Sequence, residues 1–368
     1  MNGLLTACAL SIVLYVLRVF FWIKDWVRIE PKSIRSPSRA SLSVSIVVAA
    51  RNEAANIAKL IHSLQEQDYP CELTEIIIVD DHSTDKTAAI GSGFKNVKLV
   101  LLQNGVGKKA AIELAVKLAT GQLILCTDAD CQPASSWVSS VVSFYETTNA
   151  AFISAPVSLI KNRIGFAASF DEMESAVLIA IGGASIAAGR PTMCNGANLA
   201  YPKKVFDEVD GYAGNAHIPS GDDEFLMHKV AVKYSRKVYF LKDSKAIVTS
   251  GACPSWPSLF AQRTRWASKH RHYRSLKVKL ELLLVLLANL SFLYLLIGSI
   301  SGWIDYILPL AFMIIKVTTD FNLLSSAFKF LNKKISIPRF LFFQITYPLY
   351  LIAVGIAANF FKYTWKGR

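Results

Sequence analysis

Apolar residues form two kinds of stretch in this chain, long ones toward its two ends and short ones in between. The long stretches cover residues 4–23, 280–300, 303–317 and 340–361. All except 303–317, which carries Asp305 and Lys316 at its ends, reach the length that an α-helix needs to cross a bilayer. We therefore expect an N-terminal membrane anchor and a C-terminal membrane domain of about three helices.

Basic residues beside these stretches predict how the chain is oriented. They follow the first stretch and precede the second: Lys24, Arg28, Lys32, Arg35 and Arg39, then Lys269, Arg271, Arg274, Lys277 and Lys279. Positively charged flanks stay in the cytoplasm, so we expect the N-terminus outside and the region between the two stretches inside. No basic residue precedes the first stretch, which predicts an uncleaved anchor and not a signal peptide.

The weak stretch 303–317 leaves two arrangements open. If it crosses the membrane, the basic loop 329–339 lies inside and the basic tail 362–368 lies outside. If it is only re-entrant, the tail lies inside and the loop outside. We favour three crossings in the C-terminal region.

The short apolar runs alternate with helical patterns. Residues 43–50, 75–79, 97–102 and 123–126 read as buried strands, and residues 56–67 and 107–118 have helical periodicity. This alternation predicts a parallel α/β sheet. Ligands bind outside the carboxyl ends of such strands, where Asp80, Asp81 and Asp128 lie. Ser83 or Thr84 can cap the helix that follows the second strand.

The later part of this region is less regular. Residues 152–157 read as a strand, and residues 195–201 lead into another. Residues 164–181 predict a helix with one apolar face and one acidic face that carries Asp171, Glu172 and Glu174. The Gly- and Ala-rich residues 182–189 are expected to be flexible, and residues 254–273 form a basic, aromatic segment.

Composition agrees with one membrane part and one soluble domain. The chain has 368 residues, is 52% hydrophobic and has a net charge of +13. Its mean hydropathy of +0.35 is high for a soluble protein and low for a membrane bundle. The expected divisions are an anchor (1–24), a basic linker (25–41), a cytosolic catalytic domain (42–253), an interfacial segment (254–279) and a membrane domain (280–368).

The positive charge and the cysteines have simple explanations. Much of the basic excess flanks the membrane stretches and suits anionic lipid head groups, and we find no nucleic-acid-binding module. Membrane lipids are therefore expected partners and nucleic acid is not. The six cysteines form no CxxC pair, which indicates reduced thiols.

Three polar clusters could carry chemistry. Asp128 and Asp130 straddle one residue, so on an extended backbone both carboxylates point the same way and can bind Mg²⁺ or Mn²⁺. A turn after a strand is the alternative explanation for this pair. Asp222 and Asp223 could supply a general base, and Arg263 with Arg265 could hold a diphosphate.

These clusters belong to a series of pieces that resembles one family. The pieces are VVAARNEAANI (47–57), VDDHSTDKT (79–87), TDADC (127–131), CNGANLAY (194–201), SGDDEFL (220–226) and QRTRW (262–266). In this order, and with the flanking membrane stretches, they resemble membrane-integrated family 2 glycosyltransferases of the GT-A fold. Cellulose, hyaluronan and poly-N-acetylglucosamine synthases and ceramide glucosyltransferases are such enzymes. The resemblance covers about residues 42–275.

The resemblance implies roles for individual residues. Asp223 would be the general base with Asp222 beside it, and Asp128 and Asp130 would hold the metal. The nucleotide donor, expected to be a UDP-sugar, would contact the following residues: Ala50, Arg51, Asn52, Glu53, Asp80, Asp81, Lys108 and Asp128. The QRTRW piece would contact the diphosphate or the acceptor through Gln262, Arg263, Arg265 and Trp266. An interfacial anchor is the alternative role for QRTRW.

The sequence leaves the acceptor open. We favour inverting transfer of a sugar to a lipid or lipid-linked acceptor, because four weakly polar spans are few for a polymer channel. A processive polysaccharide synthase that extends a growing glycan, alone or as an oligomer, is the second hypothesis. The third is a catalytically silent nucleotide-sugar sensor or scaffold. The layout fits a bacterial inner membrane.

Overall fold

The computed structural model describes residues 2–30, 42–161, 165–215, 218, 221–269 and 275–360 of the chain. These residues divide into two compact units. The sheet unit contains the described residues of 28–162 and 181–252, and the helical unit contains those of 1–27, 163–180 and 253–363.

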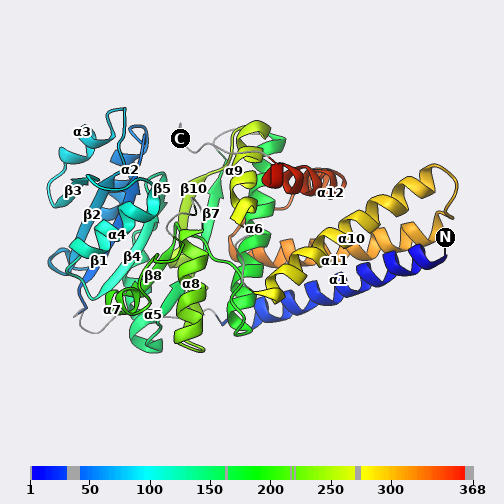
Figure 1. Ribbon diagram of the computed structural model, residues 1–368, viewed down its shortest axis with the longest axis horizontal. Helices are drawn as coiled ribbons and strands as arrows, with labels where there is room; N and C mark the ends of the chain where they lie inside the picture. Colours follow the sequence, from blue (N-terminus) through cyan, green and yellow to red (C-terminus); the bar gives the residue numbers. More distant parts are fainter. Residues whose placement is uncertain are drawn as a thin grey trace. The chain divides into compact units, whose positions relative to one another are not determined.

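A mostly parallel sheet forms the centre of the sheet unit (Figure 1). Its strands among the described residues are β1 (Val44–Ala50), β2 (Thr74–Asp80), β3 (Val97–Leu101), β4 (Leu123–Asp128), β6 (Phe152–Ser154), β8 (Leu199–Pro202) and β9 (Val238–Phe240). Their order is β3-β2-β1-β4-β8-β6-β9. Strands β1 to β4 are parallel, and β8 is antiparallel to both of its neighbours. The predicted α/β fold with a mostly parallel sheet is confirmed.

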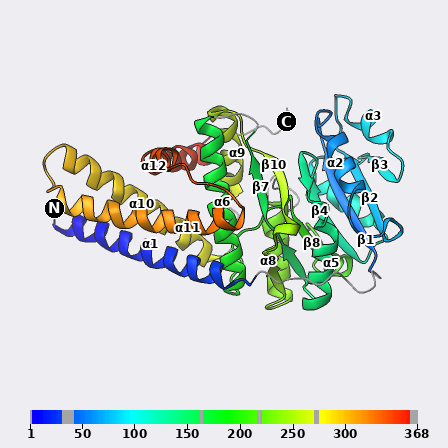
Figure 2. The ribbon, with the colours of Figure 1, turned by 180° about the vertical axis from the view of Figure 1, so that it is seen from behind.

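Helices cover both faces of this sheet (Figures 1 and 2). Helices α2 (Ile57–Gln65) and α5 (Trp137–Thr148) bury their apolar sides in one core with Ile46 and Val48. Helix α4 (Lys108–Leu118) contacts β1 and β2. The central strands read as unbroken apolar runs because they are buried on both faces. The described residues of the unit also form α3 (Thr87–Ser92), α7 (Lys203–Glu208), α8 (Asp222–Lys233) and the short 3-10 helices Cys71–Leu73 and Ser244–Ala246.

A second sheet of three strands lies in the same unit. It joins β5 (Cys131–Pro133), β10 (Val248–Gly251) and β7 (Val157–Ile160). Strand β5 follows β4 almost at once, so this small sheet fixes the chain just after Asp128 and Asp130. The strand predicted over 152–157 is in fact split, since β6 belongs to the large sheet and β7 to the small one.

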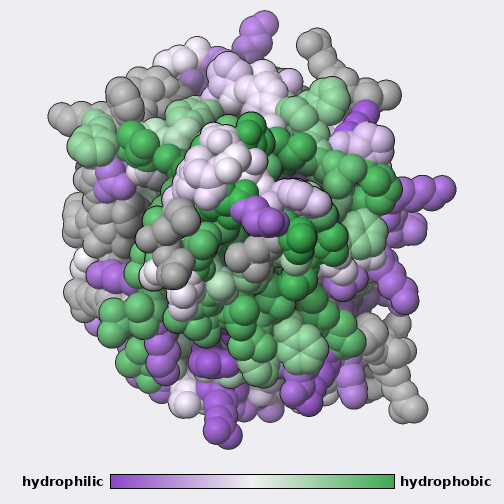
Figure 3. Space-filling model, turned by 90° about the vertical axis from the view of Figure 1, so that its right-hand side faces the viewer, coloured by the Kyte–Doolittle hydropathy of each residue, from purple (hydrophilic) through white to green (hydrophobic). Residues whose placement is uncertain are grey.

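Long helices make up the helical unit. They are α1 (Asn2–Arg28), α9 (Trp256–Ser268), α10 (Leu276–Ile300), α11 (Ile307–Phe330) and α12 (Ile337–Phe360), together with most of α6 (Phe166–Ala187). Among the described residues, α1, α10, α11 and α12 are long and apolar enough to cross a membrane. Many of their leucine, isoleucine and phenylalanine side chains point outward. Figure 3 looks at the side of the helical unit on which α1, α10 and α11 lie in Figure 1, and apolar side chains gather there. Such a surface suits contact with lipid.

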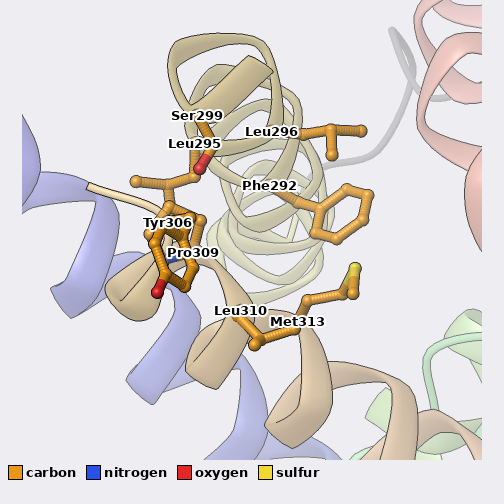
Figure 4. A pocket seen from close by; sticks show the side chains of 8 residues that line it. All are labelled: Phe292, Leu295, Leu296, Ser299, Tyr306, Pro309, Leu310 and Met313. Carbon is orange, nitrogen blue, oxygen red and sulfur yellow. The ribbon is translucent and has the colours of Figure 1, made fainter. Parts of the chain in front are cut away.

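An apolar pocket of about 180 Å³ lies between α10 and α11. Phe292 and Leu296 line it from α10, Met313 lines it from α11, and Tyr306 lies just before α11 (Figure 4). Apart from Ser299 and Tyr306 the lining residues are apolar, and none of them is a carboxylate, a histidine or an amine.

Two predictions need correction, the extent of the third apolar stretch and the flexibility of residues 182–189. The weak third stretch is a full-length apolar helix, α11, which extends to Phe330 and not only to residue 317. Residues 182–187, expected to be flexible, continue helix α6 to Ala187, since small residues such as Ala184 and Ser185 are buried there. The basic segment 254–273 contains helix α9, which starts at a capping box of Ser255 and Ser258. Lys32, Arg35, Arg39 and the tail 362–368 lie outside the described residues.

Candidate functional site

Strand register brings the first acidic residues together. In the β1–β4 ladder Ala49 pairs with Asp128, and in the β1–β2 ladder Ala50 pairs with Asp80. The three strands are parallel and end at the same level, so their carboxyl ends form one edge of the sheet. This is the edge at which the sequence predicted ligand binding.

The loops after β1 and β2 are tied to each other at this edge. Arg51 donates from Nη1 to the backbone oxygens of Asp81 and His82, at 2.8 and 3.2 Å. The Asn52 backbone N–H donates to Ser83 Oγ at 2.9 Å, and the Thr84 N–H donates to Asn52 Oδ1 at 2.8 Å. The prediction that Ser83 or Thr84 caps helix α3 is therefore wrong, because the helix begins at Thr87 without a side-chain cap at Lys86.

Asp80 and Asp81 lie buried beneath these loops. Asp80 Oδ2 accepts the Ser83 N–H at 3.0 Å, which is a turn of the kind that aspartate forms after a strand. Its Oδ1 is buried and has no hydrogen-bond partner among the described residues. A buried carboxylate oxygen without a partner is costly. The Asp80 side chain thus has a local structural role and one acceptor left for a ligand. Glu53, also buried, donates its backbone N–H to Thr87 Oγ1 at 2.7 Å.

Lys108, the first residue of α4, joins the strand end to helix α8. Its Nζ lies 2.6 Å from Asp128 Oδ1 and 3.3 Å from Asp222 Oδ2. Partial burial alone would lower the pKa of Lys108, but the two carboxylates outweigh it and hold the pKa well above its usual value. Burial alone would raise the pKa of Asp222, and the Lys108 ammonium outweighs it and lowers that pKa. Each charge therefore stabilises the other at this position.

Asp223 is oriented by backbone donors. Its Oδ2 accepts the Gly196 N–H at 2.9 Å, and its Oδ1 accepts the Glu224 N–H at 2.8 Å. A Cβ added to Gly196 would lie 3.0 Å from Lys108 Nζ and 3.4 Å from Asp222 Oδ2. Glycine at this position lets the 194–198 loop approach both acidic residues. Gly196 was not predicted, although its place inside CNGAN is the signal that could have identified it.

The predicted metal pair has suitable ligands. Asp128 is half-buried at the end of β4 and Asp130 is exposed in the turn that leads to β5. No group of three or more His, Cys, Asp or Glu residues within the described ranges could hold a metal alone. Two hard carboxylates on one turn suit Mg²⁺ or Mn²⁺, which commonly takes its other ligands from water and substrate phosphates. The pair therefore fits a metal that is shared with a substrate.

The QRTRW residues belong to the helical unit, whereas the residues described so far belong to the sheet unit. Arg263 is only 5% exposed and donates from Nη2 to Asp171 at 2.6 Å and from Nε to Glu174 at 2.8 Å. Its guanidinium also lies 4.3 Å from the centre of the Trp266 ring. Gln262 accepts a further bond from Arg263. The acidic face predicted for α6 is thus buried, with Asp171 and Glu174 paired with Arg263 and Glu172 paired with Lys333 at 2.6 Å.

Arg265 differs from Arg263. It is half-buried and forms no ion pair among the described residues. Burial raises the pKa of Glu174, and the Arg263 guanidinium opposes this rise without cancelling it. Two carboxylates thus occupy the Arg263 guanidinium, whereas no carboxylate of the described residues is paired with Arg265.

Comparison with known proteins identifies a family that matches part of this chain. A model of the family "Glycosyl transferase family 2" matches residues 45–210. The beta-monoglucosyldiacylglycerol synthase of Nostoc sp. is 27% identical over 245 residues, which are 65% of this chain and 51% of that protein. The Escherichia coli UDP-Glc:alpha-D-GlcNAc-diphosphoundecaprenol beta-1,3-glucosyltransferase WfaP is 34% identical over 111 residues, which are 30% of this chain and 43% of that protein. The chain spans about half the length of the first of these relatives.

A solved structure shares the fold. The mannosyltransferase PcManGT from Pyrobaculum calidifontis, in complex with GDP-Man and Mn²⁺, has a TM-score of 0.60 and 18% sequence identity. The alignment covers 98% of this chain and 98% of that one. Together with the family match, this likeness confirms the GT-A-like fold.

Proposed function

We propose that this chain, whose residues 45–210 form a glycosyl transferase family 2 domain, transfers a sugar from a nucleotide donor to a lipid or lipid-linked acceptor. The observation that carries the proposal is the cluster of Lys108, Asp128, Asp222 and Asp223 at the carboxyl ends of the parallel strands. The proposed catalytic domain covers residues 42–253 and faces the cytoplasm. The apolar helices would hold the chain in a bacterial inner membrane.

Donor binding is assigned to the loops after β1 and β2. The backbone of Ala50, Arg51 and Asn52, the Glu53 side chain and the spare oxygen of Asp80 would contact the nucleoside, with Asp81 beside them. Lys108 would exchange its contact with Asp128 for one with a phosphate oxygen, since an ammonium binds either anion. Uridine is the expected base, and Arg265 is the residue of the QRTRW motif that we assign to the diphosphate.

Asp223 is assigned the proton transfer. Its two backbone hydrogen bonds hold the carboxylate in one orientation, as a general base requires. The carboxylate would accept the acceptor hydroxyl proton while the hydroxyl oxygen forms a bond to the anomeric carbon and the bond to the diphosphate breaks. This single displacement inverts the anomeric centre. Mg²⁺ or Mn²⁺ held by Asp128 and Asp130 would neutralise charge on the departing diphosphate.

Two observations favour a lipid or lipid-linked acceptor. The described residues include four helices that are long and apolar enough to cross a membrane. The two sequence relatives reported above are named for a glucosyldiacylglycerol and for a diphosphoundecaprenol-linked sugar. A membrane-bound acceptor would reach the enzyme from the bilayer in which these helices lie.

Product analysis tests the proposal directly. Purified protein in lipid is incubated with Mn²⁺ or Mg²⁺, radiolabelled nucleotide-sugars and membrane lipids. We expect metal-dependent label in an organic-extractable product, and loss of that label with a chelator. Label in a high-molecular-weight, glycosidase-sensitive product would show a polysaccharide synthase instead. Absence of transfer from every donor would contradict the enzyme hypothesis and favour a sensor or scaffold.

Substitution of Lys108 by methionine should weaken donor binding. A hydrogen bond to a charged group contributes about 1.5–3 kcal/mol, so we expect a loss of roughly 10- to 100-fold in affinity for the nucleotide. Isothermal titration with UDP measures it. Lys117→Met is the matched control, because Lys117 lies on the same helix and is exposed. Unchanged affinity in Lys108→Met would remove Lys108 from the donor site.

A further inference from the structure

Lys109, to which the sequence analysis assigned no role, contacts the chain next to Asp222 and Asp223. Its side chain is only 7% exposed. Its Nζ donates to the backbone oxygen of Asn215 at 2.6 Å and to that of Ile218 at 2.8 Å. The same ammonium lies 5.5 Å from the centre of the Phe225 ring. The Lys109 ammonium is thus directed at two backbone oxygens and one aromatic face.

These contacts flank the residues to which we assign catalysis. The Ile218 N–H donates to the Asn215 oxygen at 3.1 Å, so the two oxygens that Lys109 contacts lie close together. Helix α8 begins four residues after Ile218, with Asp222 and Asp223 in its first turn. Phe225 lies on the same helix, one turn after Gly221, whose oxygen accepts the Phe225 N–H at 3.1 Å. Lys109 therefore contacts the chain on both sides of the acidic pair.

The side chains of consecutive helix residues point about 100° apart, so Lys108 and Lys109 at the start of α4 reach different parts of the chain. Lys108 is directed at the carboxylates of Asp128 and Asp222, and Lys109 is directed at the backbone oxygens of Asn215 and Ile218. The charge of Lys108 holds the side chain of Asp222, whereas the hydrogen bonds of Lys109 hold the backbone at Asn215 and Ile218. The backbone position of α8 decides where the Asp223 carboxylate lies.

We propose that Lys109 is a positioning residue that holds the start of α8 so that Asp223 meets the acceptor hydroxyl. This inference rests on the proposed function, because it assigns Lys109 to the same reaction. Lys109 itself touches neither donor nor acceptor in this proposal. A misplacement of about 1 Å can lower a rate about 10²-fold, so loss of this tether should be visible in turnover.

A second lysine provides a comparison within the same region. Lys229, on α8, donates to the backbone oxygens of Val209, Asp210 and Gly211 at 3.0, 3.3 and 2.8 Å. It holds the chain at the end of α7, farther along the sequence from Asp222. Protection of residues 209–211 should depend on Lys229 and not on Lys109.

The experiment uses the full chain in lipid with Lys109→Met, Lys109→Arg and the exposed control Lys117→Met. Hydrogen exchange of the amides of residues 222–225, UDP affinity, kcat and KM for the donor are measured. Lys109→Met should speed exchange at 222–225 but not at 209–211, and should lower kcat about 10²-fold while the donor KM stays within about twofold. Lys109→Arg keeps the positive charge and the hydrogen-bond donors, so it should restore most of the amide protection and most of kcat.

Two outcomes overturn the inference. Unchanged exchange and kcat in Lys109→Met would show that Lys109 does not position α8. Parallel loss of UDP affinity and kcat, without recovery in Lys109→Arg, would show a general effect on domain stability. If the wild-type chain transfers no sugar, the proposed function fails, and hydrogen exchange alone still decides whether Lys109 holds the start of α8.

Discussion

Asp223→Asn is expected to lower the turnover number by about 10²–10⁴-fold, the range that a positioned general base contributes. Asparagine keeps the shape of the side chain but cannot accept a proton at neutral pH. The amide oxygen would keep only one of the two backbone N–H bonds, that of Gly196 (2.9 Å) or that of Glu224 (2.8 Å), because the amide nitrogen cannot accept the other. UDP affinity should therefore change little, since the donor loops after β1 and β2 are not altered.

Single-turnover kinetics with radiolabelled donor, and titration with UDP, measure the two quantities separately. Asp207→Asn is the matched control, because Asp207 is an exposed aspartate on α7. An Asp223→Asn protein with wild-type turnover would contradict the assignment of the base. A wild-type protein that binds UDP without turnover, and whose binding does not depend on Asp223, would be a sensor.

Arg263→Met is expected to reduce the free energy of unfolding by about 3–5 kcal/mol, the usual cost of removing one partner of a buried ion pair. Arg263 is 5% exposed, and Asp171 and Glu174 are 2% and 7% exposed. Without the guanidinium these two carboxylates face each other in the interior of the helical unit with no cation between them. Thermal or denaturant unfolding in detergent, followed by tryptophan fluorescence, measures the change.

Two further variants make this prediction specific. Arg265→Met should leave the unfolding midpoint close to the wild-type value and should weaken diphosphate binding, because Arg265 forms no ion pair among the described residues. A triple variant, Arg263→Met with Asp171→Asn and Glu174→Gln, should recover part of the lost stability since no buried charge is left. If Arg263→Met unfolds like the wild type and loses diphosphate affinity, the clamp role implied by the family resemblance holds for Arg263.

The sheet could be predicted because its signals are local. The runs 43–50, 75–79, 97–102 and 123–126 are apolar throughout, and they became β1, β2, β3 and β4 within one or two residues at each end. The short strands β5, β9 and β10 could not be predicted, since each has only three or four residues and pairs with a segment distant in sequence. Such strands are stabilised by their neighbours more than by their own residues.

The candidate site, like the sheet, could be predicted from the sequence only in part. Sequence order placed Asp80, Asp81 and Asp128 at strand ends, and parallel register then brought those ends to one edge. The Lys108 contacts with Asp128 and Asp222, the Gly196 contact with Asp223 and the Lys109 tether required the fold. They join residues 20 to 114 positions apart, for which one sequence carries no signal.

Sequence by itself determined the long apolar stretches, the α/β class and the family resemblance, because apolar length, periodicity and motif order are properties of neighbouring residues. Only the tertiary structure decided which charges are paired. Arg263 and Glu174 are 89 positions apart, and Arg263 and Asp171 are 92 apart. Taken separately, the basic QRTRW motif and the acidic face of α6 would each be expected to face solvent. Their pairing removes both from solvent, because a buried charge is tolerated only beside an opposite one.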